Sequence, residues 1–278
     1  MFRVTFWGVR GSIASPGPET ARIGGNTSCI EVRAGSELVI LDGGTGLRLL
    51  GEKLLSEGPL RASMFFSHVH WDHIQGFPFF APAFVSGNAF VLYGGKNVTQ
   101  TLEETLAGQM NFPTFPVHLT DMGARMMFRD LAEGEEVHVG EGVVVTSARL
   151  NHPGGVLAYR IEHAGRTIVY ATDNEHGAAP DPKLLALAKG ADLLVYDAQY
   201  TPEEYTGETG RGSKVGWGHS TMMEGARIAK LAGVKELVLF HHDPSQDDDA
   251  VDRKEARARE SFAATRSARE GLSIDIGS

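Results

Sequence analysis

Three histidines and one aspartate lie within six residues, directly after the short apolar run at 64–66. The four residues are His68, His70, Asp72 and His73. Imidazole nitrogens and carboxylate oxygens are common ligands of zinc and similar ions. A polar loop that is rich in histidine by chance is the simpler explanation. That explanation does not account for further candidate ligands later in the chain, which a metal site would need. The spacing therefore predicts a metal site at the end of a buried strand.

Further candidate ligands follow three later apolar segments that have the length of strands. These candidates are His152, Asp173 and His241, and His242 competes with His241 for the last position. We favour His241 because it follows its apolar segment directly. Functional loops gather where strands end on one side of a sheet. With the first cluster, the set provides seven candidate ligands, which two adjacent metal ions would require.

Hydrophobic periodicity predicts the elements that position these residues. We expect strands at 2–7, 28–33, 37–41, 63–67, 136–139, 143–149, 156–162, 166–171, 192–196, 236–240 and 272–276. We expect helices after Gly46 and at 100–109, 182–190, 221–232 and 247–270. Strands mixed with helices predict an α/β fold with sheets inside and helices outside. Residues 76–135 are rich in Phe and Pro, and we interpret them as an insertion near the active site within one domain, 1–278.

The composition is that of an ordinary globular protein. The 278 residues are 42% hydrophobic and 22% charged, and no apolar stretch reaches the roughly eighteen residues of a membrane span. The formal charge of −9 disfavours a broad basic surface for nucleic acid. The single cysteine, Cys29, cannot form an internal disulfide, and the first residues lack the pattern of a signal peptide. We therefore expect a cytoplasmic protein.

The motifs resemble those of the metallo-β-lactamase-fold hydrolase superfamily, and the resemblance covers essentially the whole chain. It rests on residues 67–73, 152–155, 171–174 and 240–243. The resemblance implies an αββα sandwich, in which two mixed sheets pack face to face with helices outside and metals at one edge. It also implies two divalent metal ions. Zinc or manganese is the expected metal, and iron is also compatible with these donors.

The resemblance further implies which residues hold each metal ion. One ion would be held by His68, His70 and His152. The other would be held by Asp72, His73 and His241, and Asp173 would bridge both. Asp42 would lie beneath the metal loop and orient ligands, because a ligand histidine normally needs an acceptor for its second N–H group. The simpler alternative for Asp42 is a turn residue in an Asp-Gly-Gly sequence.

A second motif, at 216–221, separates branches of this superfamily. Ser220 and Thr221 are good N-cap residues for the predicted helix, but capping does not account for His219. The segment is similar to the helix start of the phosphodiesterase branch, where the histidine is the general acid for the leaving oxygen. The resemblance gives Asp197 as the carboxylate that orients His219. The expected catalytic residues are therefore Asp72, Asp197 and His219.

The expected function is a metal-dependent hydrolase of a small phosphodiester, in particular a cyclic nucleotide, that uses a metal-bridging hydroxide. Relatives that process tRNA 3′ ends carry a long basic arm between the two motifs, whereas 198–218 is short here and contains Glu203, Glu204 and Glu208. tRNA 3′ processing is therefore the alternative, and neither long nucleic acid nor a membrane is an expected partner. A lactone, thioester or β-lactam hydrolase and a non-catalytic metal-binding protein are the remaining hypotheses. The resemblance also implies a homodimer.

Overall fold

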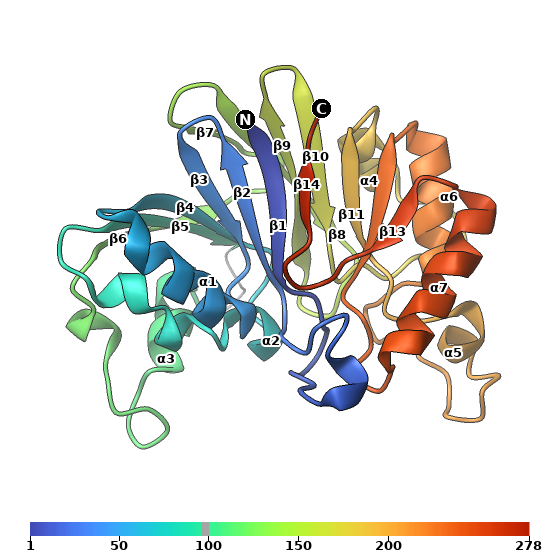
Figure 1. Ribbon diagram of the computed structural model, residues 1–278, viewed down its shortest axis with the longest axis horizontal. Helices are drawn as coiled ribbons and strands as arrows, with labels where there is room; N and C mark the ends of the chain where they lie inside the picture. Colours follow the sequence, from blue (N-terminus) through green and yellow to red (C-terminus); the bar gives the residue numbers. More distant parts are fainter. Residues whose placement is uncertain (96–99, 278) are drawn as a thin grey trace.

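The computed structural model describes residues 1–95 and 100–277, and its strands form two sheets of seven strands each (Figure 1). The first sheet, in spatial order, contains β14 (Ser273–Asp275), β1 (Phe2–Gly8), β2 (Cys29–Ala34), β3 (Glu37–Leu41), β4 (Arg61–Phe66), β5 (Ala89–Gly95) and β6 (Arg125–Leu131). The second contains β13 (Thr265–Ser267), β12 (Glu236–Phe240), β11 (Leu193–Asp197), β10 (Arg166–Ala171), β9 (Val156–His163), β8 (Val143–Leu150) and β7 (Glu136–Val139).

Each sheet is antiparallel on one side and parallel on the other. In the first sheet β1, β2 and β3 pair antiparallel, whereas β3 to β6 are parallel. In the second sheet β7 to β10 pair antiparallel, whereas β10 to β13 are parallel. Parallel strands end at a common edge, and ligand sites of α/β proteins form beyond the carboxyl ends of such strands. The topology therefore gives each sheet one edge at which side chains from several strands can meet.

Helices cover the outer faces of both sheets (Figure 1). The helices are α1 (Gly46–Leu54), α2 (Trp71–Ile74), α3 (Leu102–Gly108), α4 (Pro182–Ala188), α5 (Pro202–Thr206), α6 (Met222–Ala232) and α7 (Asp248–Ser261). α1 and α3 share an apolar cluster with the first sheet, and α4 and α6 share another with the second. A third cluster, between the sheets, includes Phe6, Phe65, Tyr159 and Phe240. These layers confirm the predicted αββα sandwich of mixed sheets.

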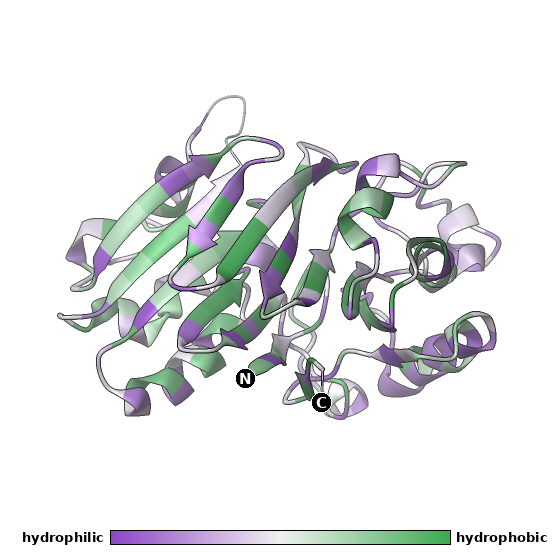
Figure 2. Cartoon of the chain, turned by 90° about the horizontal axis from the view of Figure 1, so that it is seen from above, coloured by the Kyte–Doolittle hydropathy of each residue, from purple (hydrophilic) through white to green (hydrophobic). Residues whose placement is uncertain are grey.

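Hydropathy follows the layers. Figure 2 shows hydrophobic residues along the strands and hydrophilic residues at strand ends and on the outer helices. In β1 buried and half-buried residues alternate along the whole strand, as expected for a strand with one face against the core. No helix among the described residues has both the length and the apolar character that a membrane span needs.

α6 shows how local sequence places a candidate residue. The Thr221 side chain accepts a hydrogen bond from the Glu224 backbone N–H, and Gly233 ends the helix in a left-handed conformation with φ of 66°. Both features are common at helix ends. At the N-terminus the Thr221 hydroxyl accepts from a backbone N–H that would otherwise be unpaired, and at the C-terminus glycine adopts positive φ without strain. The helix begins at Met222, and His219 therefore lies in the loop directly before its N-terminus.

The segment 76–135, interpreted from the sequence as an insertion near the active site, contributes to the first sheet. This segment contains β5 and β6, which extend the parallel part of the first sheet beyond β4. The two strands were not predicted. β6 is an edge strand in which Arg125, Met127 and Arg129 are exposed, so its sequence lacks the apolar run of a buried parallel strand. The predicted helix within this segment is α3.

The predicted helix at 247–270 is too long. α7 ends at Ser261, and Thr265–Ser267 instead forms β13 beside β12. β13 has only three residues and lies at the edge of the sheet, so it has no apolar pattern that the sequence could reveal. Two short helices, α2 and α5, were also not predicted; α2 is one helical turn built from the metal motif itself.

Candidate metal centre

Strand ends from both sheets bring the candidate ligands together. The first cluster follows β4 of the first sheet, while the remaining candidates follow strands β8, β10 and β12 of the second sheet. Three residues directly after or near these strand ends adopt left-handed backbone conformations, namely Asp42, Asp173 and His241, with φ of 59°, 50° and 60°. Such conformations are uncommon outside glycine and gather at functional sites. The chain therefore turns sharply where it presents these side chains.

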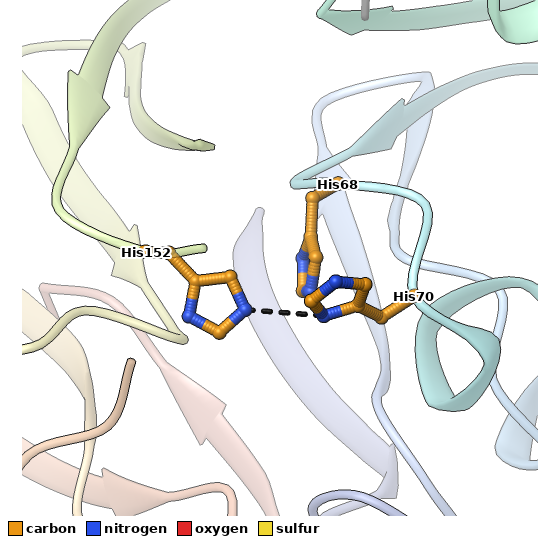
Figure 3. A group of neighbouring side chains, drawn as sticks. All are labelled: His68, His70 and His152. Carbon is orange, nitrogen blue, oxygen red and sulfur yellow. Dashed lines mark hydrogen bonds between the residues drawn. The ribbon is translucent and has the colours of Figure 1, made fainter. Parts of the chain in front are cut away.

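His68, His70 and His152 form the first candidate ligand group, and Figure 3 shows their rings converging on a common space. One nitrogen from each ring lies within 4.8 Å of the others. His70 Nδ1 and His152 Nε2 are 3.1 Å apart. Within the described part of the chain, the buried His68 Nε2 has no hydrogen-bond partner. Because buried polar atoms are almost always paired, this nitrogen and its convergent neighbours fit a metal ion.

Asp72, His73, Asp173 and His241 form the second candidate group, and all four are buried. Their ligand atoms also lie within 4.8 Å of one another. His241 Nε2 is 3.1 Å from Asp72 Oδ2 and 3.3 Å from His73 Nε2. Two imidazole nitrogens and two carboxylates in one buried space are the donor set of a divalent transition-metal site.

Asp173 faces both groups with different oxygens. Its Oδ1 is 3.8 Å from His68 Nε2 and 4.0 Å from His152 Nε2. Its Oδ2 is 3.2 Å from His73 Nε2 and 3.3 Å from His241 Nε2. A carboxylate that bridges two metal ions needs this division of its oxygens. The geometry is therefore compatible with two divalent metal ions, as the sequence predicted.

Asp42 lies beneath the metal loop, where its carboxylate accepts several hydrogen bonds. Its Oδ2 accepts from His73 Nδ1 at 2.8 Å and from the Tyr170 hydroxyl at 2.6 Å. The Ser67 backbone N–H and hydroxyl donate at 2.7 Å and 2.8 Å. The bond to Nδ1 leaves His73 Nε2 to face the second ligand group. Asp42 therefore contacts two residues of the 67–73 motif in addition to turning the chain.

Two further acceptors orient ligand histidines, and the sequence did not reveal either. His152 Nδ1 donates to the Gly218 carbonyl oxygen at 2.8 Å, and His241 Nδ1 donates to Gln199 Oε1 at 3.0 Å. A backbone carbonyl carries no residue-type signal, and Gln199 is separated from His241 by 42 positions. Both contacts turn Nε2 toward the candidate metal positions.

His241 and His242 lie in different environments. His241 Nε2 contacts Asp72 and Asp173, whereas His242 Nε2 donates to the Ala268 carbonyl oxygen at 3.1 Å. Burial lowers the pKa of His242 well below its usual range, and nearby Lys254 lowers it further. His242 is thus a neutral buried residue outside both ligand groups, and the preference for His241 agrees with this geometry.

His219 lies against Asp197, as the sequence predicted. His219 Nδ1 donates to Asp197 Oδ2 at 2.9 Å, and the His219 ring stacks on His241 with centroids 5.0 Å apart. Asp197 Oδ1 also accepts from the backbone N–H groups of Gln199 and Ser220. Burial alone would lower the pKa of His219, but the charge and hydrogen bond of Asp197 raise it to about 9. The ring is thereby held beside the candidate ligand His241 in a position that favours its protonated form.

The lowered pKa values of the first group favour metal binding. Burial lowers the pKa values of His68, His70 and His152, so their rings are neutral near pH 7, the form in which imidazole binds metals. Burial would also lower the pKa of His73, but Asp173 and the neighbouring carboxylates raise it well above its usual range. A bound cation would take the place of that proton among the carboxylates.

The fold and the two convergent ligand groups define a metal-dependent hydrolase of the αββα sandwich class. The chain belongs to the family described as beta-lactamase superfamily domain, whose model matches residues 39–242. This range includes every candidate metal ligand as well as Asp197 and His219.

Curated relatives named ribonuclease Z match this chain over different lengths. The one from Brevibacillus brevis is 36% identical over 157 residues, which cover 55% of this chain and 42% of the relative. The one from Natronomonas pharaonis is 26% identical over 288 aligned positions, which cover 86% of each chain. The Brevibacillus match therefore spans less than half of that relative, whereas the Natronomonas match extends over most of both proteins.

Solved structures share the fold at low sequence identity. The metallo-beta-lactamase fold protein YhfI from Bacillus subtilis has a TM-score of 0.70 at 21% identity and is covered over 98% of both chains. The short form of human tRNase Z has a TM-score of 0.69 at 20% identity, over 99% of this chain and 100% of that chain. Zn²⁺-bound PqqB from Methylobacterium extorquens has a TM-score of 0.72 at 18% identity, with 99% and 100% covered.

Proposed function

We propose that the protein is a phosphodiesterase that uses two divalent metal ions and acts on the 3′ region of an RNA. The ions would be held by His68, His70 and His152 and by Asp72, His73 and His241, with Asp173 between them. When bound, such a pair activates a water molecule and stabilises the negative charge of a phosphodiester during in-line displacement. The observation that carries the proposal is the hydrogen-bonded pair of His219 and Asp197 beside these ligands.

The pair supplies what phosphodiester hydrolysis needs and metal ions alone do not provide. An alkoxide is a poor leaving group, so its oxygen must receive a proton as the P–O bond breaks. With Nδ1 donating to Asp197, His219 retains Nε2 as the position from which it gives a proton to the leaving oxygen. Asp197 favours the protonated ring and fixes its plane. Asp72 contributes as a metal ligand next to the reacting phosphate.

The names of the relatives favour RNA over the cyclic nucleotide expected from the sequence. Both the Natronomonas and the Brevibacillus relatives are called ribonuclease Z, and the Natronomonas match covers most of each chain. A nucleic-acid substrate is therefore part of the proposal, although the charge of −9 had argued against one. Local binding of an RNA end needs only a few contacts beside the metal ions and does not require a broad basic surface.

A small phosphodiester is the second candidate, and the structure of 198–218 favours it. α5 in this segment has only five residues, and its Glu203 pairs with Arg257 of α7 at 2.7 Å rather than extending from the body. Glu204 caps the same helix by bonding to Thr201. The segment therefore offers no long arm for the body of a tRNA.

The experiment that tests these proposals compares substrates on one preparation of zinc- or manganese-loaded protein. An RNA with a 3′ extension, a panel of cyclic nucleotides and bis(p-nitrophenyl) phosphate are incubated with it, and its metal content is measured in parallel. We expect cleavage of bis(p-nitrophenyl) phosphate and of the RNA. Faster turnover of a cyclic nucleotide would replace RNA with the second candidate, and no turnover of any diester by protein with two bound ions would reject both.

A further inference from the structure

A pocket opens directly beside the first ligand group. Its volume is about 770 Å³, and its wall includes His152, His176, Ala178, Tyr205 and Gly216. This volume lies within the range of pockets that bind small molecules and cofactors. His152 belongs to both the pocket and the ligand group, so a molecule in the pocket would touch the metal centre. We propose that this pocket binds the nucleoside that flanks the scissile phosphate; the inference rests on the phosphodiesterase function proposed above.

Two aromatic rings give the pocket a surface for a base. The rings of His176 and Tyr205 are partly buried, with centroids 4.5 Å apart and planes tilted by 39°. His176 is fixed by a contact of 3.0 Å between its Nδ1 and Ser220 Oγ, and the Tyr205 hydroxyl donates to Glu175 Oε1 at 2.8 Å. Stacking on such rings accepts every base, because each base has a π face. Ordered rings also bind a base with little loss of side-chain freedom.

Hydrogen bonds connect the pocket wall to the metal ligands. Glu175 accepts from the Tyr205 hydroxyl and from the backbone N–H groups of Gly216 and Gly218. The Gly218 carbonyl oxygen in turn accepts from His152. These hydrogen bonds therefore fix the pocket wall in position relative to the metal centre.

The charge of the pocket wall indicates which part of the substrate the pocket accepts. Three uncharged donors already bond to the Glu175 carboxylate, and the other named wall residues carry no fixed positive charge. A phosphate would find no cation in this wall, whereas a base and its sugar are uncharged. The phosphate belongs at the ligand histidines, and the nucleoside belongs in the pocket, one contact away at His152.

The test compares two ligands that share a phosphate but differ in the base. Adenosine 5′-monophosphate and ribose 5-phosphate are titrated into zinc-loaded protein by calorimetry, and tryptophan fluorescence reports the pocket because Trp217 directly follows Gly216. We expect the nucleotide to bind at least about tenfold more tightly than ribose 5-phosphate and to change the fluorescence. Equal affinities would overturn the proposal.

Two variants address the pocket, and a third serves as the control. Ala178→Trp fills the pocket and His176→Ala removes one ring, and each should lower nucleotide affinity at least about tenfold while ribose 5-phosphate affinity changes less than about twofold. Ala256→Trp places the same side chain on an exposed position of α7 and should leave both affinities unchanged. Thermal melting checks that all variants fold. Unchanged nucleotide affinity in both folded pocket variants would also overturn the proposal.

The outcome separates the pocket from the proposed function. Cleavage of diesters together with equal binding of the two ligands rejects the pocket and leaves the function standing. A clear preference for the nucleotide without cleavage of any diester rejects the function but retains a nucleoside site.

Discussion

A hydrogen bond connects the His152 side chain to the backbone of Gly218: the Gly218 carbonyl oxygen accepts from His152 Nδ1 at 2.8 Å. A Cβ atom at Gly218 would lie only 2.3 Å from this nitrogen, and Gly218 adopts a φ of 90°. The loop that carries His219 therefore packs on the candidate ligand His152 so closely that only glycine fits. This loop and the first candidate ligand group are thus built as one unit.

Gly218→Ala should displace His152 and weaken metal binding about 10- to 100-fold, which is the usual effect of losing a contact that orients a ligand. Metal affinity is measured by competition with a chelator. Gly216→Ala is the matched control, since Gly216 has a similar φ of 86° but its Cβ would meet nothing within 4 Å. Equal losses in the two variants would attribute the effect to backbone strain and contradict this explanation.

His219→Ala should reduce the turnover of RNA by about a hundredfold or more, because an alkoxide leaving group needs a proton donor. The same variant should lose little turnover of bis(p-nitrophenyl) phosphate, because p-nitrophenolate leaves without protonation. Metal content, measured by elemental analysis, should remain that of the wild type, since His219 lies in neither proposed ligand set. Equal losses on both substrates would show that His219 does not act as the acid.

The pH profile of turnover should reflect the same proton. Asp197 raises the pKa of His219 to about 9, so the ring is protonated below that pH and activity falls as pH rises through it. Two bound cations would lower this value, which places the fall at or below pH 9. Asp197→Asn removes the carboxylate charge and should move the fall to lower pH in plots of kcat against pH. A fall at the same pH in both proteins would assign it to another group.

Lys254 should contribute a pH-dependent part of stability. Its ammonium group is buried and donates to the Ala198 and Gln199 carbonyl oxygens at 2.6 Å and 3.3 Å. Burial lowers its pKa from 10.5 to about 8. Between these values the unfolded chain binds more protons than the folded protein, so stability should rise with pH across this window.

Urea unfolding of the metal-free protein at pH 7 and pH 9.5 measures this effect. In the wild type the rise should be on the order of 1–2 kcal/mol, and Lys254→Met should abolish it. The variant should also lose about 1–3 kcal/mol at pH 7, because the buried Ala198 carbonyl oxygen loses its ammonium donor. An undiminished rise in Lys254→Met would assign the pH dependence to other residues.

The candidate metal ligands could be recognised in the sequence because their signal is local and chemical. His68, His70, Asp72 and His73 crowd into one short motif, and the later ligands each follow an apolar strand. The groups that orient them were harder to find. Gln199 acts through a side-chain amide and Gly218 through a backbone carbonyl, and both depend on contacts between distant segments. No pattern of residue types marks such contacts before the chain is folded.

An edge position alone does not decide whether a strand could be predicted, because the edge strands β7 and β14 were expected from the sequence whereas β5, β6 and β13 were not. β1 alternates along its whole length, whereas β6 and β13 are edge strands with exposed polar residues. Their pairing comes from neighbouring strands rather than from their own sequence. The Phe- and Pro-rich segment 76–135, interpreted as an insertion near the active site, contains β5 and β6 of the first sheet.

The two sheets also divide most of the chain near residues 132–135, with β1 to β6 before this loop and β7 to β13 after it, while β14 returns to the first sheet. His68, His70, Asp72 and His73 lie on one side of the division, and His152, Asp173 and His241 lie on the other. Neither fragment of a chain cut in this loop would possess a full coordination sphere for either ion. Metal binding would then favour association of the two fragments. The protein could therefore serve as a split reporter, in which the amount of reassembled protein depends on the concentration of available zinc or manganese.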